Sequence, residues 1–242
     1  MSFSLIFSIK IPTIYAFNNI KYVTNNNIVK YNHDNYTLIV NILKDTEKDN
    51  LIPYANLINI ETINCIPNDS TNKIAYVLSL PQQSSFIAFY KNIGTKDYKF
   101  DGIIDNLSNI KNFYYYRDFI VVEQIDSSSD TNFTPKEFLE VFFNKNDTYI
   151  SVFKKNIYME KILKDPDLNE NEVKKELETS SIDFLEGNYP RILCVNTHTL
   201  YNGIFISLNN SYEFIEDKKI TKKEIYEWCP DIECFSIKKE LN

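Results

Sequence analysis

Short runs in which apolar and polar residues alternate recur along the chain and most constrain its fold. Near the start, Phe3, Leu5, Phe7, Ile9 and Ile11 have mostly polar residues between them, which is the two-residue period of a half-buried strand. Further β-type runs, separated by Asn, Asp, Gly, Pro or Ser, cover residues 14–23, 36–43, 74–80, 85–90, 119–124, 191–195 and 203–208. Short strands punctuated by turn residues predict an antiparallel sheet or barrel.

Two segments carry a specific helix-start signal. Thr134, Pro135 and Glu137 form a capping box with proline at the first helical position, which predicts a helix over residues 135–144. The same box stands at the start of a second apolar stretch and predicts a helix over residues 222–228.

A third, charged segment covers residues 169–178, where Val173 and Leu177 form a thin apolar stripe of helical spacing. The fold class is therefore α+β and β-rich, an antiparallel sheet or barrel with two or three short helices. Because predicted strands lie on both sides of these helices, we expect a single domain over residues 1–242.

Composition excludes several function classes. The 242 residues include 26 basic and 33 acidic ones, for a net charge of −7. An acidic chain is poorly suited to nucleic acid or an anionic membrane surface, and we expect neither as a partner. The four glycines are scattered singly, so no glycine-rich loop is available to hold a phosphate, and no cofactor is expected.

Cysteine and histidine are too sparse to predict a metal site. The cysteines are Cys65, Cys194, Cys229 and Cys234, and the only histidines are His33 and His198. No second close cysteine pair and no nearby histidine completes a zinc set, so we interpret the thiols as buried and inert.

Residues 1–11 lack the basic start and continuous apolar stretch of a signal peptide, and no apolar run reaches the ~18 residues of a membrane span. We expect a cytoplasmic protein.

The residues themselves give only weak candidates for catalysis. Cys194 and His198 are four apart near a predicted strand, and a cysteine with a histidine base is a known nucleophile pair. The simpler interpretation is a core cysteine beside a surface histidine. The tyrosines of residues 114–116, followed by Arg117, could stack on bases, but without a basic surround they are better interpreted as a strand whose side chains alternate between core and surface.

The order of segments resembles the baculoviral anti-apoptotic, broad-spectrum caspase inhibitors. The passages that carry the resemblance are residues 4–11 (SLIFSIKI), 89–94 (FYKNIG), 115–124 followed by 136–140 (KEFLE), and 191–194 (RILC) followed by 203–210 (GIFISLNN). The resemblance implies a β-barrel with an exposed loop that a caspase cuts after an aspartate. The cut is then arrested as a thioester on the protease cysteine, shielded by the inhibitor's own N-terminus.

Two departures from this family pattern matter. Inhibitory members carry a cysteine directly after the initiator methionine, whereas this chain has Ser2. The insertion that presents the family's loop is reduced to residues 44–73. The resemblance therefore implies an altered or absent inhibitory mechanism.

Three aspartates are candidate reactive sites, because a caspase needs an aspartate followed by a small residue in an extended segment. Asp69 is followed by Ser70 inside the shortened insertion and is preferred. Asp49 is followed by the bulkier asparagine, and Asp101 is followed by Gly102 near the end of a predicted strand. Each also fits an ordinary polar turn.

Three functions stay open on the sequence. The first is a viral or virus-derived inhibitor that acts on a host protein such as a caspase to suppress apoptosis. The second is a protein-binding or decoy module of the same fold without a working reactive loop. The third is an enzyme that uses Cys194 and His198, although we expect no enzyme.

Overall fold

The computed structural model describes residues 21–24, 27–30, 35–65, 73–80, 84–94, 97–126, 136–146, 148–163, 172–206 and 211–241. The chain forms two compact units. Unit 1 comprises Met1–Pro81 and Phe86–Asp105, and unit 2 comprises Gln82–Ser85 and Asn106–Asn242. The expectation of a single domain over the whole chain stays a prediction.

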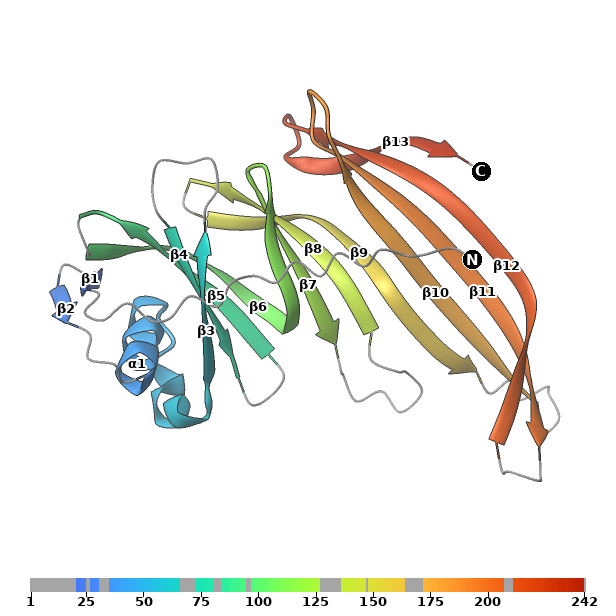
Figure 1. Ribbon diagram of the computed structural model, residues 1–242, viewed down its shortest axis with the longest axis horizontal. Coiled ribbons are helices and arrows are strands. Elements are labelled where there is room, and N and C mark those ends of the chain that lie inside the picture. Colours follow the sequence, from blue (N-terminus) through green and yellow to red (C-terminus); the bar gives the residue numbers. More distant parts are fainter. Residues whose placement is uncertain are drawn as a thin grey trace, which may run out of the picture. The chain divides into compact units, whose positions relative to one another are not determined.

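Strands dominate the structure (Figure 1). In chain order the elements are β1 (Lys21–Thr24), β2 (Asn27–Lys30), α1 (Asn35–Asp45), the 3₁₀-helix η1 (Asp49–Leu57), β3 (Asn59–Cys65), β4 (Lys73–Ser79), β5 (Ser84–Asn92), β6 (Asp97–Tyr116), β7 (Phe119–Asp126), β8 (Lys136–Lys145), β9 (Thr148–Leu163), β10 (Glu172–Leu185), β11 (Arg191–Ile206), β12 (Ser211–Cys229) and β13 (Cys234–Leu241).

The strands from β3 to β13 are hydrogen-bonded in chain order. β5 and β6 each contribute residues to both units. The small β1–β2 hairpin pairs with the start of β6, and β1 runs parallel to it. The predicted β-rich antiparallel sheet is confirmed, but the sheet is open, because β3 and β13 are the two ends of the order and are not paired with each other among the described residues. The barrel alternative is therefore wrong for this part of the chain.

The one α-helix of the described residues lies where the sequence predicts a strand. Residues 36–43 belong to α1, and Ile39, Ile42 and Leu43 are its buried side chains. Their spacing of three and four residues places them on one helical face. They pack with Tyr76 of β4 and other residues of the unit 1 core. The short apolar run fits both periods, and packing against the sheet decides for the helix.

The helix predicted over residues 135–144 is also wrong. Residues 136–144 belong to β8, which pairs antiparallel with β7 and β9. Leu139 and Val141 lie on one face of the strand and Phe138 and Phe142 on the other, and all four are buried. Because both faces of β8 are covered, its apolar residues do not alternate with polar ones, and a fully buried strand then resembles a helix in the sequence.

The two remaining helix predictions fall on strands as well. Residues 222–228 form the end of β12, which pairs with β11 and β13. Residues 169–178 include the start of β10, where Val173 and Leu177 lie on one face at an even spacing. Spacing by four is compatible with a helix and with a strand, so it did not separate the two. The described residues include two helices, α1 and η1, which is a number within the predicted two or three, but neither lies where a helix was predicted.

The strand predictions succeed better. Residues 74–79 of the run 74–80 fall on β4, and residues 85–90 and 119–124 fall on β5 and β7. Residues 191–195 and most of 203–208 belong to the longer β11. Of residues 14–23, only the last three are described, in β1, and residues 3–11 lie outside the described residues.

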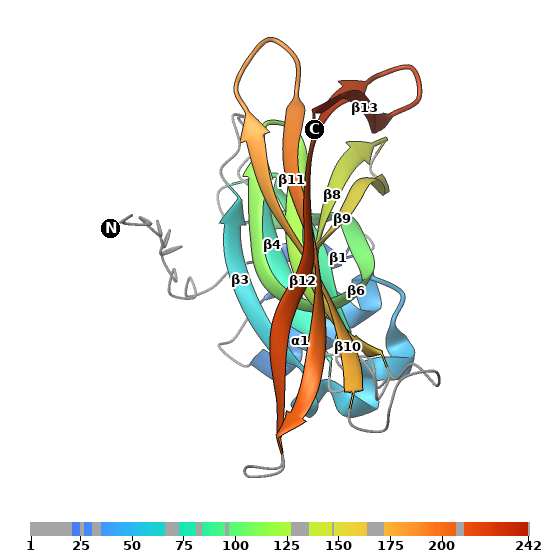
Figure 2. The same ribbon diagram turned by 90° about the vertical axis from the view of Figure 1, so that its right-hand side faces the viewer.

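A core cluster of unit 2 lies on one face of its sheet. Because residues paired directly across antiparallel strands share a face, Ile182, Cys194 and Glu224 face the same side. We call this side the Cys194 face. At one end of it, rings of β7, β8, β9, β12 and β13 pack into an aromatic cluster of Phe119, Phe143, Phe153, Tyr226, Trp228 and Phe235. β13 turns back at the end of β12 (Figures 1 and 2) and contacts β9.

A buried carboxyl at the end of α1 predicts a pH effect in unit 1. Asp45 accepts a hydrogen bond of 2.8 Å from the Tyr90 hydroxyl. Burial raises the pKa of Asp45 from 3.8 to about 6, and the Tyr90 bond opposes it only partly. Between these values the folded protein binds the proton more tightly than the unfolded chain, so this carboxyl lowers the stability as the pH rises through the window.

We expect Asp45→Asn to stabilise unit 1 by about 1 kcal/mol at neutral pH, after allowance for partial solvent access. Asparagine still accepts the Tyr90 hydrogen bond and carries no charge. Below about pH 4 the difference should vanish. Hydrogen exchange of α1 and β5 amides measures the stability of this unit. Asp49→Asn, at an exposed position of η1, is the matched control, and a gain in both variants would contradict the assignment to Asp45.

Candidate functional site

The Cys194 face changes from apolar to polar along the strands of unit 2. Beyond the aromatic cluster, Glu224 of β12 is the centre of a polar network. Its Oε2 atom accepts hydrogen bonds from Lys155 Nζ at 2.9 Å, Asn196 Nδ2 at 2.7 Å and the Tyr226 hydroxyl at 2.9 Å. Ser180 Oγ donates to Asn196 Oδ1 at 2.9 Å. Four strands, β9 to β12, therefore meet in one connected set of side chains, which we call the Glu224 network.

The protonation states in the Glu224 network follow from these contacts. Burial favours the neutral form of Glu224, but the hydrogen bonds from Lys155, Tyr226 and Asn196 outweigh it and lower its pKa. Burial also opposes the charge on Lys155, but the hydrogen bond to Glu224 and the electrostatic interactions with Tyr226, Glu224 and Cys194 together outweigh it and raise the pKa of Lys155. Burial and the bond to Glu224 raise the pKa of Tyr226 to about 12. The network thus holds an ammonium, a carboxylate and a neutral phenol.

Cys194 lies on the same face and is fully buried. Burial raises the pKa of its thiol to about 11, although the Lys155 charge opposes the shift. The thiolate is the nucleophilic form of cysteine, so this thiol stays in its unreactive form at neutral pH. Cys194 is therefore buried, as the sequence predicts for the thiols, whereas Cys229 and Cys234 are only partly buried.

Cys194 and His198 do not form a pair. Both belong to β11, and four residues of strand separate them by about 13 Å. Cys194 is opposite Glu224 on β12, whereas His198 is exposed and opposite Ile220. Hydrogen-bonded contact of about 3 Å between thiol and imidazole, which a cysteine nucleophile needs, is absent between these two residues.

A pocket of about 300 Å³ adjoins the Glu224 network. Its lining combines Lys155, Asn196 and Glu224 of the network with Glu178, Thr197, His198, Ile220 and Lys222. Acidic, basic and amide groups are all present, so the pocket suits hydrogen bonding to a polar group. No thiol is among the residues that line this pocket. The carboxylate of Glu224, which the pocket shares with the network, already accepts three hydrogen bonds.

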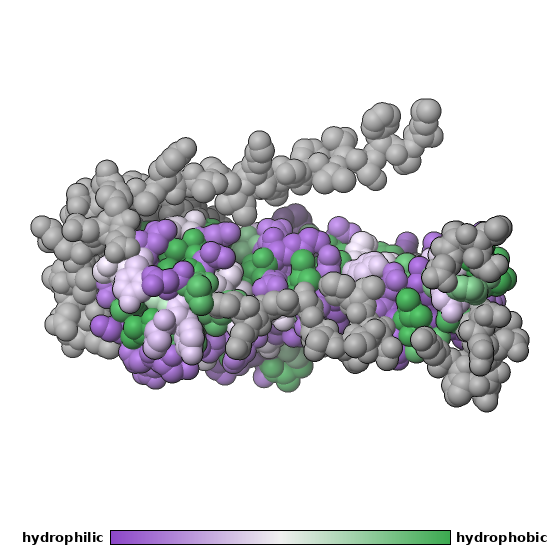
Figure 3. All heavy atoms as spheres, turned by 90° about the horizontal axis from the view of Figure 1, so that it is seen from below, coloured by the Kyte–Doolittle hydropathy of each residue, from purple (hydrophilic) through white to green (hydrophobic). Residues whose placement is uncertain are grey.

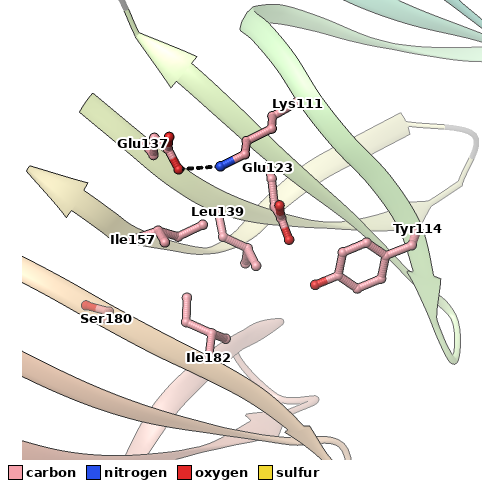
Figure 4. Close-up of a pocket in the computed structure, with 8 residues that line it drawn as sticks. All are labelled: Lys111, Tyr114, Glu123, Glu137, Leu139, Ile157, Ser180 and Ile182. Carbon is pink, nitrogen blue, oxygen red and sulfur yellow. Dashed lines mark hydrogen bonds and ion pairs between the residues drawn. The ribbon is translucent and has the colours of Figure 1, made fainter. Parts of the chain in front are cut away.

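A second, smaller pocket of about 160 Å³ lies on the same face (Figure 4). Leu139, Ile157 and Ile182 give it an apolar wall, and Lys111 Nζ forms an ion pair of 2.6 Å with Glu137 at its rim. The Tyr114 phenol reaches in from β6. Burial, followed by the charge of Glu123, raises the pKa of Tyr114, so its hydroxyl stays protonated. Ser180 lines this pocket and links it to the Glu224 network through Asn196.

The reactive-site candidates are placed differently from one another. Asp101 and Gly102 lie inside β6, where Asp101 forms an ion pair of 2.8 Å with Lys73 and its side chain is 14% exposed. Asp49 is exposed and begins η1. Asp69, Ser70 and Ser2 lie outside the described residues.

The other candidates from the sequence do not gather at one place. Tyr114 and Tyr116 share the Cys194 face and Tyr115 lies on the opposite face of β6, as the predicted alternation requires. Arg117 follows in the turn to β7. Within the described residues, no three His, Cys, Asp or Glu side chains are grouped so as to hold a metal ion. None of the described helices has the length and apolar character to cross a bilayer.

Sequence reasoning missed the residues of the Glu224 network. In the sequence, Glu224 is the last residue of the capping box Thr221–Glu224 that predicts the helix over residues 222–228, and Lys155, Asn196 and Ser180 carry no motif. One signal could have found part of it, because Glu224, Tyr226 and Trp228 alternate with period two and place a carboxylate in line with two aromatic rings on a strand. The partners on β9, β10 and β11 are known only from the strand register.

Comparisons with known proteins add no family. No protein-family model matches the chain, and no curated protein matches it. One solved structure, a GDP-Man-dependent mannosyltransferase from Leishmania mexicana, is similar with a TM-score of 0.30 and 8% identity, over 75% of this chain and 69% of that one. A similarity this low carries no conclusion about fold or activity.

Proposed function

We propose that the protein acts by binding another protein and not by catalysing a reaction. The observation that supports this most is the Glu224 network, whose ammonium, amide and phenol all donate to one carboxylate oxygen. Groups that satisfy one another in this way hold the strands together and are not poised for proton transfer. The nearby thiol of Cys194 is buried and protonated. The sheet then serves as a rigid scaffold that presents its surface to a partner. We take the chain to be viral or virus-derived and the partner to be a protein of the host.

A second candidate is inhibition of a caspase through a reactive loop, as the family resemblance implies. One observation favours it: Asp69 and Ser70 fall in the connection between β3, which ends at Cys65, and β4, which begins at Lys73. Asp101 is a poor substrate, because its carboxylate is paired with Lys73 and its backbone belongs to a strand. Asp49 is in a helical and not an extended conformation, which leaves Asp69 as the preferred scissile residue.

Incubation with a panel of active caspases separates the two candidates. Residual peptidase activity reports inhibition, and a denaturing gel with intact-mass measurement reports cleavage and any protease-linked adduct. If the protein is only a binding module, the caspases leave its chain intact. A reactive-loop inhibitor is cut after Asp69, and Asp69→Ala abolishes both the cut and the inhibition, whereas Asp49→Ala does not. Because Ser2 offers no N-terminal thiol, the adduct should hydrolyse faster than in relatives that have one.

We expect Cys194→Ala and His198→Ala to retain full binding activity, because the two residues neither touch each other nor form an activated nucleophile. Cys194→Ala should cost about 1 kcal/mol of stability as a small core truncation, and His198→Ala should cost almost nothing. Thermal unfolding is measured together with binding to the caspases of the panel and inhibition of them. A variant that folds with unchanged stability and has lost its activity would revive the enzyme alternative.

A further inference from the structure

The long strand β12 has one side without a partner along half of its length. β11 pairs with β12 from Ser211 to Glu227, but β13 pairs only with residues 223–229. Residues 212–222 therefore have no strand on their outer side among the described residues, as the view of β12 in the foreground of Figure 2 shows. An open strand edge presents unpaired backbone donors and acceptors, which a second strand can satisfy.

Charges are distributed unevenly along this open edge. Its first half carries the acidic residues Glu213, Glu216 and Asp217, and its second half carries the basic residues Lys218, Lys219 and Lys222. A parallel copy of the same edge would bring like charges together. An antiparallel copy brings each acidic half against a basic half, so the edge is complementary to itself.

A bulge in β12 makes this self-pairing possible. The register with β11 shifts at Asp217, so that Glu216 is opposite Tyr201 and Lys218 is opposite Leu200. The extra residue reverses which face each later side chain occupies. Residues an odd number apart across the bulge consequently share a face, such as Ile215 and Ile220, which are opposite Asn202 and His198.

The contacts of Phe214 show which face each side chain of β12 occupies before the bulge, independently of the strand register. Phe214 lies over Gly203, where an added Cβ atom would come within 2.7 Å of both the Phe214 ring and Val173. The ring is also 4.6 Å from Lys175 Nζ. Phe214 thus lies on the face opposite the Cys194 face, and its neighbour Ile215, which is 55% exposed, lies on the Cys194 face.

We propose that two copies of this chain pair antiparallel along residues 212–222 of β12, about a two-fold axis at the bulge. In this register Ile215 is opposite the partner's Ile220, Glu216 is opposite the partner's Lys219, and Glu213 is opposite the partner's Lys222. Each pair shares a face, and the symmetry makes each pair occur twice. The two exposed isoleucines bury each other, and the backbone groups of the open edge become hydrogen-bonded.

The register is specific. A slip of two residues in either direction keeps the faces matched but places Ile215 opposite the partner's Lys218 or the partner's Lys222. A slip of one residue moves every side chain to the wrong face. An edge whose charges served only to prevent association would carry like charges that repel a second copy, whereas this edge has an acidic half and a basic half. On the face drawn in Figure 3, hydrophobic residues are interspersed with hydrophilic ones among the coloured residues.

Sedimentation equilibrium and light scattering with the full chain test the proposal. At about 100 µM we expect a species of twice the 28.5 kDa chain mass. Glu216→Lys alone and Lys219→Glu alone each create two repulsive pairs per dimer and should raise the dissociation constant at least about tenfold. An equimolar mixture of the two variants restores both ion pairs between unlike chains and should dimerise again.

The mixture makes the test independent of folding defects, because both variants must be folded to restore the dimer. Lys91→Glu, which makes the same charge change at an exposed position of β5, should leave the dimer unchanged. A monomeric wild-type chain, larger non-closing assemblies, or two variants that fail to combine would each overturn the proposal. None of these outcomes depends on whether the protein binds a host protein.

Discussion

Replacing Phe119 with alanine is expected to lower the unfolding free energy of unit 2 by about 3–5 kcal/mol. The Phe119 side chain is almost completely buried, and its ring centroid lies 4.9 Å from that of Trp228 and 5.1 Å from that of Phe235. Because strands β7, β12 and β13 all contribute rings here, the cavity is lined by three strands that cannot close over it without moving the backbone.

Urea unfolding of the full chain measures this loss, followed by circular dichroism and by the fluorescence of Trp228, which is the single tryptophan. Tyr189→Ala, at a position that is 66% exposed between β10 and β11, is the matched aromatic truncation and should change the free energy by less than about 0.5 kcal/mol. A Phe119→Ala cost below about 1 kcal/mol would show that the aromatic cluster does not form as described.

The second large effect is expected at Glu224. Glu224→Gln keeps the shape of the side chain but leaves the Lys155 ammonium, whose side chain is only 22% exposed, without its counter-charge. We expect a loss of about 2–3 kcal/mol. The double variant Glu224→Gln with Lys155→Met should recover most of the loss, because both members of the pair are then neutral.

The pH dependence of this loss has a definite sign. The pKa of Glu224 is lower in the folded protein than its ordinary value of 4.5, so its contribution to stability is complete above that value and is lost as the pH falls through the folded pKa. The difference between wild type and Glu224→Gln should therefore shrink in acid. Glu227→Gln, on the same strand with a more exposed partner, Lys238, is the control. An equal loss in both variants at neutral pH would argue against a special role for the Glu224 network.

Strands β4, β5 and β7 were predictable although both of their faces are buried, because each is a short run rich in apolar, β-branched and aromatic residues and is bounded by turn residues. β8 and α1 show where this signal fails. Both are apolar over a short stretch, and β8 is covered on both faces while α1 buries one stripe, so the sequence period does not separate them. The capping boxes misled for a related reason: they describe only local hydrogen bonding, and pairing with neighbouring strands outweighed them in β8 and β12.

The candidate site was less predictable than the fold. Glu224, Lys155 and Asn196 come from three strands, and only the register brings them within hydrogen-bond distance of one another. Cys194 and His198, by contrast, are near each other in sequence but lie far apart in space, because the strand that holds both extends by about 3.3 Å per residue. Proximity along the chain is therefore a poor guide to chemistry in a sheet, where neighbours are set by strand pairing.

The order of strands has a consequence for synthesis on the ribosome. From β3 onward, each strand pairs with the one made just before it, so hairpins can add one by one to an edge that already exists. The aromatic cluster is the exception, because Phe119 is made early and Phe235 of β13 covers it from the far end of the order. Until β13 leaves the exit tunnel, the rings of Phe119, Phe143 and Trp228 stay open on one side, and the nascent chain exposes a site to which chaperones that bind aromatic segments have access.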